Sequence, residues 1–122
     1  MTRRVLIVED EAAISEALTF LLEKEGFVVS AEHTGKAGLA AARATDFDAL
    51  IIDLLLPDVS GAEVCARLRE DGSEVSILLL TARSHEDAAA QASEARATAF
   101  MTKPFEIQDL LARLRTLLPA DV

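Results

Sequence analysis

The chain is poor in several residue types that mark particular classes of protein. Its 122 residues include one cysteine, three prolines and five glycines, with neither tryptophan nor tyrosine. The single cysteine, Cys65, excludes an intramolecular disulfide and is typical of a reducing compartment. We expect its side chain to pack as a small buried hydrophobe. Because 51 % of the residues are hydrophobic, disorder is disfavoured, and we predict one compact domain over residues 1–122.

Positive charge is also scarce. The chain has 12 lysines and arginines against 21 aspartates and glutamates, a formal net charge of −9. An acidic surface repels phosphate backbones, so we expect no direct binding to nucleic acid and favour metal cations or basic surfaces as partners. No segment approaches the roughly 20 apolar residues of a membrane span, and no hydrophobic export signal follows Arg3-Arg4. We therefore predict no membrane association and a cytoplasmic location.

Five short apolar runs alternate with five stretches of helical periodicity. The expected strands are Val5–Val8, Phe27–Ala31, Ala49–Ile52, Val75–Leu80 and Ala99–Thr102. The expected helices are one that carries Ile14, Leu18, Leu21 and Leu22 and ends at Gly26, then Gly35–Ala44, Gly61–Glu70, Ser84–Arg96 and Glu106–Leu118, with Pro119 as the final stop. Mostly continuous apolar runs are typical of strands covered on both faces. The pattern predicts an α/β fold with a single doubly wound, five-stranded parallel sheet built from (βα)5 units.

The expected helix over Ser84–Arg96 has no apolar side chain larger than alanine. Burial stabilises a protein by roughly 25 cal/mol per Å² of apolar surface, so a stripe of alanines contributes little. We therefore expect this helix to be the least firmly packed and the most easily displaced.

The C-terminal ends of parallel strands meet at one edge of the sheet, where folds of this class bind their ligands. The residues that follow the expected strands at this edge are three acids, a hydroxyl and an amine: Glu9, Asp10, Asp53, Thr81 and Lys103. Neighbouring carboxylates repel one another, and a divalent cation that prefers oxygen ligands would offset that repulsion together with the lysine ammonium. The sequence therefore predicts a Mg²⁺ site.

We assign no role in this site to the other polar residues near this edge. Glu32-His33-Thr34, after the second strand, adds no recognisable chemistry. Glu11 and Asp58 are interpreted as ordinary first-turn and turn charges.

Five short motifs, in order along the chain, resemble those of response-regulator receiver domains of bacterial two-component signalling. They are Glu9-Asp10, Asp53, "LPDVSG" after it, Thr81-Ala82, and Lys103-Pro104-Phe105. The resemblance covers essentially the whole chain. It implies a flavodoxin-like, chemotaxis-regulator-like fold with strand order 2-1-3-4-5.

The resemblance also implies a role for each site residue. Asp53 would accept a phosphoryl group from the phosphohistidine of a histidine kinase or phosphotransfer protein. Asp10, Asp53 and the Leu55 carbonyl would bind Mg²⁺ directly, with Glu9 acting through water. Lys103 would neutralise phosphoryl charge, with Lys103-Pro104 a candidate cis peptide. The Thr81 hydroxyl and the Ala82 backbone N–H would bind the phosphoryl group.

The same resemblance implies a conformational switch. Phosphorylation would draw Thr81 inward and let Phe100 rotate, changing the face formed by the fourth helix, fifth strand and fifth helix. A plain core role for Phe100 remains the alternative. On that face, positions that carry glycine, acidic or basic residues in many receivers are occupied by Arg96, Thr98, Ala99 and Ala89. We therefore expect a dimer through it to be weak or absent, and a downstream effector or output domain to be a possible partner.

Two further functions compete with this signalling switch, which would catalyse only its own phosphorylation and dephosphorylation. A Mg²⁺-dependent aspartyl-phosphate phosphohydrolase needs a second acid two residues after the nucleophile, where this chain has Leu55. A phosphorylation-independent interaction module would need no chemistry at Asp53. Dinucleotide binding is disfavoured because "VEDEAA" replaces the glycine-rich phosphate turn.

Overall fold

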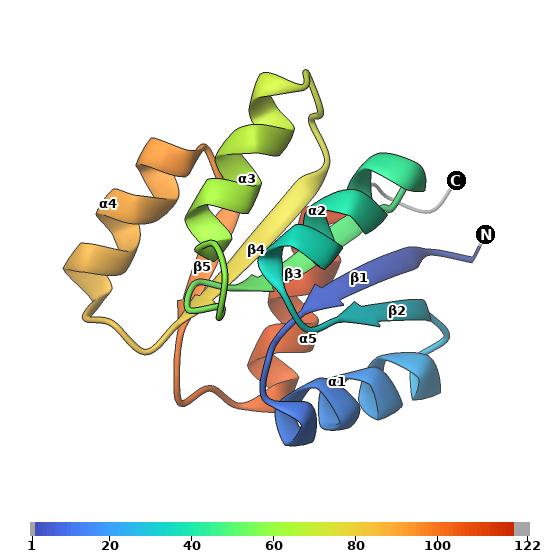
Figure 1. The fold of residues 1–122 in the computed structure, drawn as a ribbon. Coiled ribbons are helices and arrows are strands. Elements are labelled where there is room, and N and C mark those ends of the chain that lie inside the picture. The colour runs from blue at the N-terminus through green and yellow to red at the C-terminus, as the bar shows by residue number, and fades with distance from the viewer. Residues whose placement is uncertain (1, 119–122) are drawn as a thin grey trace.

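The computed structural model describes residues 2–118 as five strands and five helices in strict alternation (Figure 1). The strands are β1 (Arg4–Val8), β2 (Val28–Glu32), β3 (Ala49–Asp53), β4 (Ser76–Thr81) and β5 (Ala99–Thr102). The helices are α1 (Ala12–Lys24), α2 (Gly35–Ala44), α3 (Gly61–Glu70), α4 (His85–Ala95) and α5 (Ile107–Leu117). The predicted bounds of α2 and α3 agree at both ends. Pro119, the expected stop after α5, lies outside the described residues.

The five strands form one parallel sheet in the order β2-β1-β3-β4-β5. Helices α1 and α5 cover one face, and α2, α3 and α4 cover the other (Figure 1). This three-layer arrangement confirms the predicted doubly wound fold and its strand order. Because β1 lies between β2 and β3, the order of the strands reverses there, which is where folds of this class bind ligands.

Successive side chains along each strand point to opposite faces of the sheet, so the hydrophobic core has two layers. Leu6, Val8 and Ile52 point toward the layer of α2, α3 and α4, whereas Val5 and Ile7 point toward α1 and α5. All five side chains have at most 1 % of their surface exposed. The three inner strands are therefore buried on both faces, as their continuous apolar runs predict.

The prediction of burial on both faces is wrong for β2. This strand lies at the edge of the sheet with one neighbour, and its first residue, Val28, is 47 % exposed. β5, at the other edge, is half-buried throughout. An edge strand has fewer elements to cover it, and an apolar run alone does not reveal which strand lies at the edge.

The side chains that helix α4 buries are all small. Its buried residues are Ala88, Ala92 and Ala95. The helix ends at Arg96, which has a left-handed backbone (φ 61°), the conformation that usually selects glycine at this point of a helix. The Cys65 thiol, fully buried as predicted, donates to the Ala95 carbonyl (3.3 Å). Within residues 2–118, no helix has the length and apolar character needed to cross a bilayer.

Candidate functional site

The register of the sheet brings the predicted site residues to one edge. β1 and β3 pair Val8 with Ile52, so Glu9 and Asp53 leave the sheet side by side. β4 and β5 pair Thr81 with Thr102, so the next residue, Lys103, emerges at the same edge. Parallel pairing thus gathers side chains that are up to 94 positions apart in the chain.

Glu9, Asp10 and Asp53 form a compact group of carboxylates. One oxygen from each lies within 4.8 Å of the others. Glu9 and Asp53 are buried, with 1 % and 5 % of their surfaces exposed, whereas Asp10 is exposed. The group therefore has two buried carboxylates and one that faces water.

Lys103 forms ion pairs with both buried carboxylates. Its Nζ lies 3.0 Å from Glu9 Oε1 and 3.0 Å from Asp53 Oδ2. Burial disfavours the charged ammonium, but the hydrogen bonds to Glu9 and Asp53 outweigh it and raise the pKa of Lys103 above its usual value. Lys103 therefore stays protonated within the site.

Glu9 is the group whose protonation the site perturbs most strongly. Its burial raises its pKa from 4.5 to about 7, although hydrogen bonds from the Glu11 N–H and from Lys103 act in the opposite direction. The nearby Asp53 carboxyl adds to the increase. A further cation among these oxygens would favour the ionised carboxylates, which is how metal binding and proton release become coupled.

The Asp53 side chain accepts a hydrogen bond within its own turn, and the Asp53 backbone packs closely against a glycine. Its Oδ1 accepts a hydrogen bond from the Leu55 N–H (3.3 Å), and its carbonyl lies so close to Gly61 that a Cβ there would be 2.2 Å away. The Gly61 N–H donates to the Leu54 carbonyl (2.9 Å). The start of α3 therefore packs directly on the end of β3. Leu55 itself is 60 % exposed.

Thr81 and Lys103 meet at the ends of β4 and β5. Thr81 is 2 % exposed, and its Oγ1 accepts a hydrogen bond from the Arg83 N–H (3.0 Å). The Lys103 N–H donates to the Thr81 carbonyl (2.6 Å), and the Lys103-Pro104 peptide bond is cis, as predicted. The Thr81 hydroxyl is thus engaged with its own turn, and Ala82 lies exposed beside it.

A second feature of this edge is an apolar groove beside Lys103. It has a volume of about 580 Å³ and runs between α1 and the β5–α5 loop. Its lining residues are Ala13, Ile14, Ala17, Leu18, Ala82, Lys103, Pro104, Phe105 and Ile107. The groove places an apolar surface next to the charged site.

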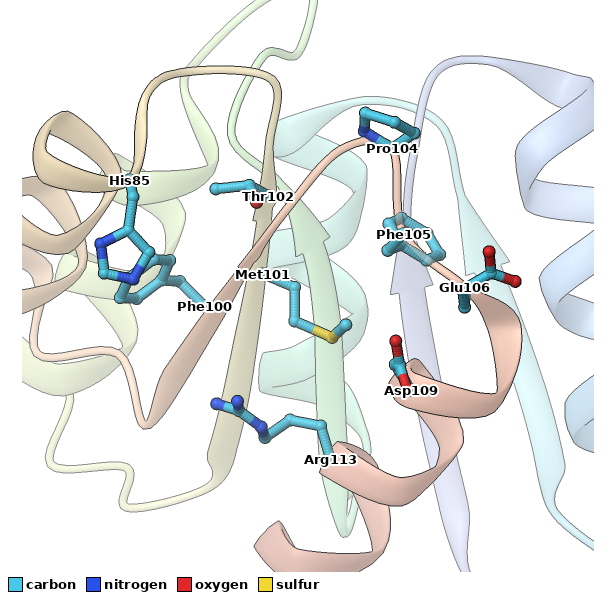
Figure 2. Close-up of a pocket in the computed structure, with 9 residues that line it drawn as sticks. All are labelled: His85, Phe100, Met101, Thr102, Pro104, Phe105, Glu106, Asp109 and Arg113. Atoms are coloured by element: carbon cyan, nitrogen blue, oxygen red, sulfur yellow. The ribbon is translucent and has the colours of Figure 1, made fainter.

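Phe100, the predicted switch residue, lies partly buried on β5 at the edge of a cavity of about 500 Å³ (Figure 2). Its ring contacts the imidazole of His85 edge-on, with centroids 5.1 Å apart. Glu106 and Asp109 line the side of the cavity opposite His85 and Phe100, and the Arg113 side chain extends below Phe100 (Figure 2). Phe100 therefore links β5 to the first residue of α4.

The donor set fits a hard divalent cation. Three carboxylates supply the oxygen ligands that Mg²⁺ prefers, and the exposed Asp10 leaves room for water in the remaining coordination positions. Asp10, Asp53 and Glu9 are therefore the residues that could hold the ion.

Two polar contacts near this site were missed by the sequence analysis. His33 Nδ1 lies 3.0 Å from the Glu9 carbonyl oxygen, and both carboxylate oxygens of Asp58 accept hydrogen bonds from the start of α2. His33 and Asp58 are isolated residues in loops, and neither has a local pattern that predicts a partner 22 to 24 positions away.

The fold and this edge define a doubly wound α/β protein with an acid- and lysine-lined site where the strand order reverses. The family model of the response regulator receiver domain matches residues 5–115. The chain is 42 % identical over 114 residues to the uncharacterized transcriptional regulatory protein YkoG of Bacillus subtilis, covering 93 % of this chain and 50 % of YkoG. It is 37 % identical over 118 residues to the response regulator MprA of Mycobacterium ulcerans, covering 97 % of this chain and 51 % of MprA.

A comparison with solved structures leads to the same family. The chemotaxis protein CheY4 of Vibrio cholerae has a TM-score of 0.90 and 28 % identity, with 97 % of this chain and 100 % of that chain covered. The chain belongs to the response regulator receiver domain family of two-component signal transduction. It spans about half the length of the curated relatives it matches.

Proposed function

We propose that this receiver domain is a phosphoacceptor switch in which Asp53 is phosphorylated by a phosphohistidine donor. The observation that carries the proposal is the environment of the Asp53 carboxylate. It is buried at a strand end, lies 3.0 Å from the Lys103 ammonium, and has the carboxylates of Glu9 and Asp10 within 4.8 Å. Such a site can hold cations around a single nucleophilic oxygen.

In the proposed transfer, a carboxylate oxygen of Asp53 forms a bond to phosphorus as the P–N bond of the phosphohistidine breaks. The electron pair of that bond stays with the imidazole, which takes a proton from solvent. Lys103 neutralises developing charge on the phosphoryl oxygens, and the Thr81 hydroxyl and Ala82 N–H donate hydrogen bonds to them. To donate this hydrogen bond, the Thr81 hydroxyl reorients toward the phosphoryl group, and the space it leaves admits the ring of Phe100.

Mg²⁺ is the metal we propose for the site. When bound, it supplies additional neutralisation of the phosphoryl oxygens. Asp10, Asp53 and the Leu55 carbonyl would hold it directly, and Glu9 would do so through water. The exposed side chain of Asp10 supports this assignment because it can reach an ion that retains water.

A histidine kinase or phosphotransfer protein is the proposed donor. The apolar groove between α1 and the β5–α5 loop supports this, because it lies beside Lys103 and offers a protein donor a surface to pack on. A downstream effector or output domain, and a cytoplasmic location, complete the proposal. The transcriptional-regulator names of relatives twice as long as this chain support an output domain.

We propose no turnover of a metabolite. A phosphohydrolase of this chemistry needs an acid two residues after the nucleophile, and the side chain there is the exposed, apolar Leu55.

The experiment is incubation with acetyl phosphate and Mg²⁺, followed by intact mass spectrometry. We expect one adduct of about 80 Da, the mass of a phosphoryl group, on the wild-type chain and none on Asp53→Asn. Asp46→Asn, which removes an exposed carboxylate at the opposite end of the sheet, is the matched control and should be modified like the wild type. An unmodified wild-type chain would instead favour an interaction module that functions without phosphorylation.

A further inference from the structure

The segment of residues 33–36, which comprises the turn after β2 and the first two residues of α2, contacts the loop that carries Glu9 and Asp10. His33 Nδ1 lies 3.0 Å from the Glu9 carbonyl oxygen. A carbonyl only accepts hydrogen bonds, so this nitrogen is the protonated one and donates. The Glu9 N–H in turn donates to the Glu32 carbonyl (3.0 Å). Both backbone polar groups of Glu9 are thus held, one by the last residue of β2 and the other by the residue that follows it.

The same segment contacts the loop that follows Asp53. Asp58 Oδ1 accepts a hydrogen bond from the Gly35 N–H (2.7 Å), and Oδ2 accepts one from the Lys36 N–H (2.9 Å). These are free donors at the start of α2, where a carboxylate is also favoured by the helix dipole. The approach is close, because a Cβ on Gly35 would lie 2.4 Å from the Val59 side chain.

We infer that residues 33–36 together with Asp58 form a brace that positions the carboxylates of the cation site, with His33 and Asp58 as its two positioning residues. His33 fixes the backbone of Glu9, which directly precedes Asp10. Asp58 fixes the loop that leaves Asp53. The brace thereby sets the separation between the two acid-bearing loops, although neither positioning residue belongs to the carboxylate group itself.

This inference deepens the proposed function, since the site it concerns is the one at which Asp53 would be phosphorylated. A general anchoring of α2 would be a different effect, and the chain contains a matched control for it. Asp71 holds the other end of α2 through an ion pair with Arg43 (2.7 Å). Asp71→Ala removes an exposed carboxylate that contacts α2 far from the cation site.

The test is Mn²⁺ binding to the complete chain, measured from the electron paramagnetic resonance signal of the free ion. Removing a residue that orients metal ligands typically weakens metal binding 10- to 100-fold. We expect His33→Ala and Asp58→Ala each to raise the dissociation constant about tenfold. Asp71→Ala should stay within about twofold of the wild type, because it does not contact either acid-bearing loop.

Conservative variants separate positioning from stability. In His33→Asn, the Nδ2 amide occupies the place of Nδ1, so Mn²⁺ affinity should return to within about twofold of the wild type. His33→Gln carries the same amide one bond farther out and should not restore it. If Asp58→Ala fails to fold, Asp58→Asn retains one accepting oxygen and should bind Mn²⁺ with an affinity between those of wild type and His33→Ala.

Unchanged Mn²⁺ affinity in both alanine variants would overturn the inference, as would an equal loss in Asp71→Ala. A wild-type chain that binds no Mn²⁺ would also overturn it. Because binding needs no phosphoryl transfer, a chain with the expected Mn²⁺ affinities but no adduct on Asp53 would remove the proposed function and leave the brace intact.

Discussion

The Lys103 ammonium lies 3.0 Å from a carboxylate oxygen of Asp53, although the two residues are 50 positions apart in the chain. The same ammonium lies 3.0 Å from Glu9. The ammonium therefore competes with a divalent cation for the same carboxylate oxygens. It also lies where negative charge would develop on a phosphoryl group transferred to Asp53.

Replacing Lys103 should separate its effect on cation binding from its effect on the rate of phosphorylation. In Lys103→Met the acid group loses its internal cation, so Mn²⁺ affinity should rise about tenfold, as nearby charge commonly shifts such equilibria. Phosphorylation by acetyl phosphate should slow about 100-fold because one preorganised donor is lost. Lys24→Met, on the exposed last turn of α1, is the matched control. Weaker Mn²⁺ binding in Lys103→Met would contradict this interpretation of the lysine.

The contact between Gly61 and Asp53 predicts an unusually costly glycine substitution. A Cβ at residue 61 would lie 2.2 Å from the Asp53 carbonyl oxygen and 2.9 Å from the Ile52 side chain. Because the backbone oxygen cannot yield easily, Gly61→Ala should lower the free energy of unfolding by about 3 kcal/mol in urea denaturation. Gly26→Ala meets no atom within 4 Å and should cost about 1 kcal/mol from its backbone conformation (φ 97°) alone. Equal costs for the two variants would refute the packing argument.

Asp58 predicts a specific dependence of stability on pH. Hydrogen bonds from backbone N–H groups, that of Lys36 foremost, hold the pKa of Asp58 at about 2, below its usual 3.8. The unfolded chain therefore binds this proton more readily, and the stabilisation, present above about pH 4, is lost as pH falls through 2. The stability difference between wild type and Asp58→Asn should shrink over that range in denaturant titrations. If the difference in stability between the two proteins stayed constant from about pH 5 to about pH 2, the Asp58 carboxylate would be ruled out as its source.

The small buried side chains of α4 predict weak protection from hydrogen exchange. Buried residues of α4 are three alanines, whereas α1 buries Leu18 and Leu22. Because less apolar area holds α4 in place, its amides should exchange faster than those of α1 in the unphosphorylated chain. Equal protection of the two helices would show that the small side chains do not limit the stability of α4.

We expect dimerisation through the α4–β5–α5 face to be weak or absent. Arg115 of α5 is paired with Glu25 of the same chain, and Thr98 accepts a hydrogen bond from the Ile77 N–H (2.9 Å). These contacts satisfy groups within one chain, and Ala99 adds no charge to the face. Sedimentation of the beryllofluoride-treated chain over a concentration series should show a monomer. A tight dimer that Arg113→Glu disrupts would contradict the prediction.

Much of the fold could be predicted from local sequence patterns. The bounds of α2 and α3 follow from helical periodicity, and the central strands from continuous apolar runs. The exposure of β2 could not be predicted in this way, because the side chains of a strand do not record how many neighbours it has. The left-handed Arg96 was also beyond a local pattern, since a glycine would be expected in that conformation.

The sequence by itself determined which side chains stand at the strand ends, since Asp53, Thr81 and Lys103 each close or follow an apolar run whose direction in a parallel sheet is set. The tertiary structure decided how those side chains face one another: Glu9 is buried against Lys103 while its neighbour Asp10 is exposed, and His33 and Asp58 hold the loops between them. Orientation at a loop depends on contacts between segments distant in the chain, and such contacts exist only once the sheet has assembled.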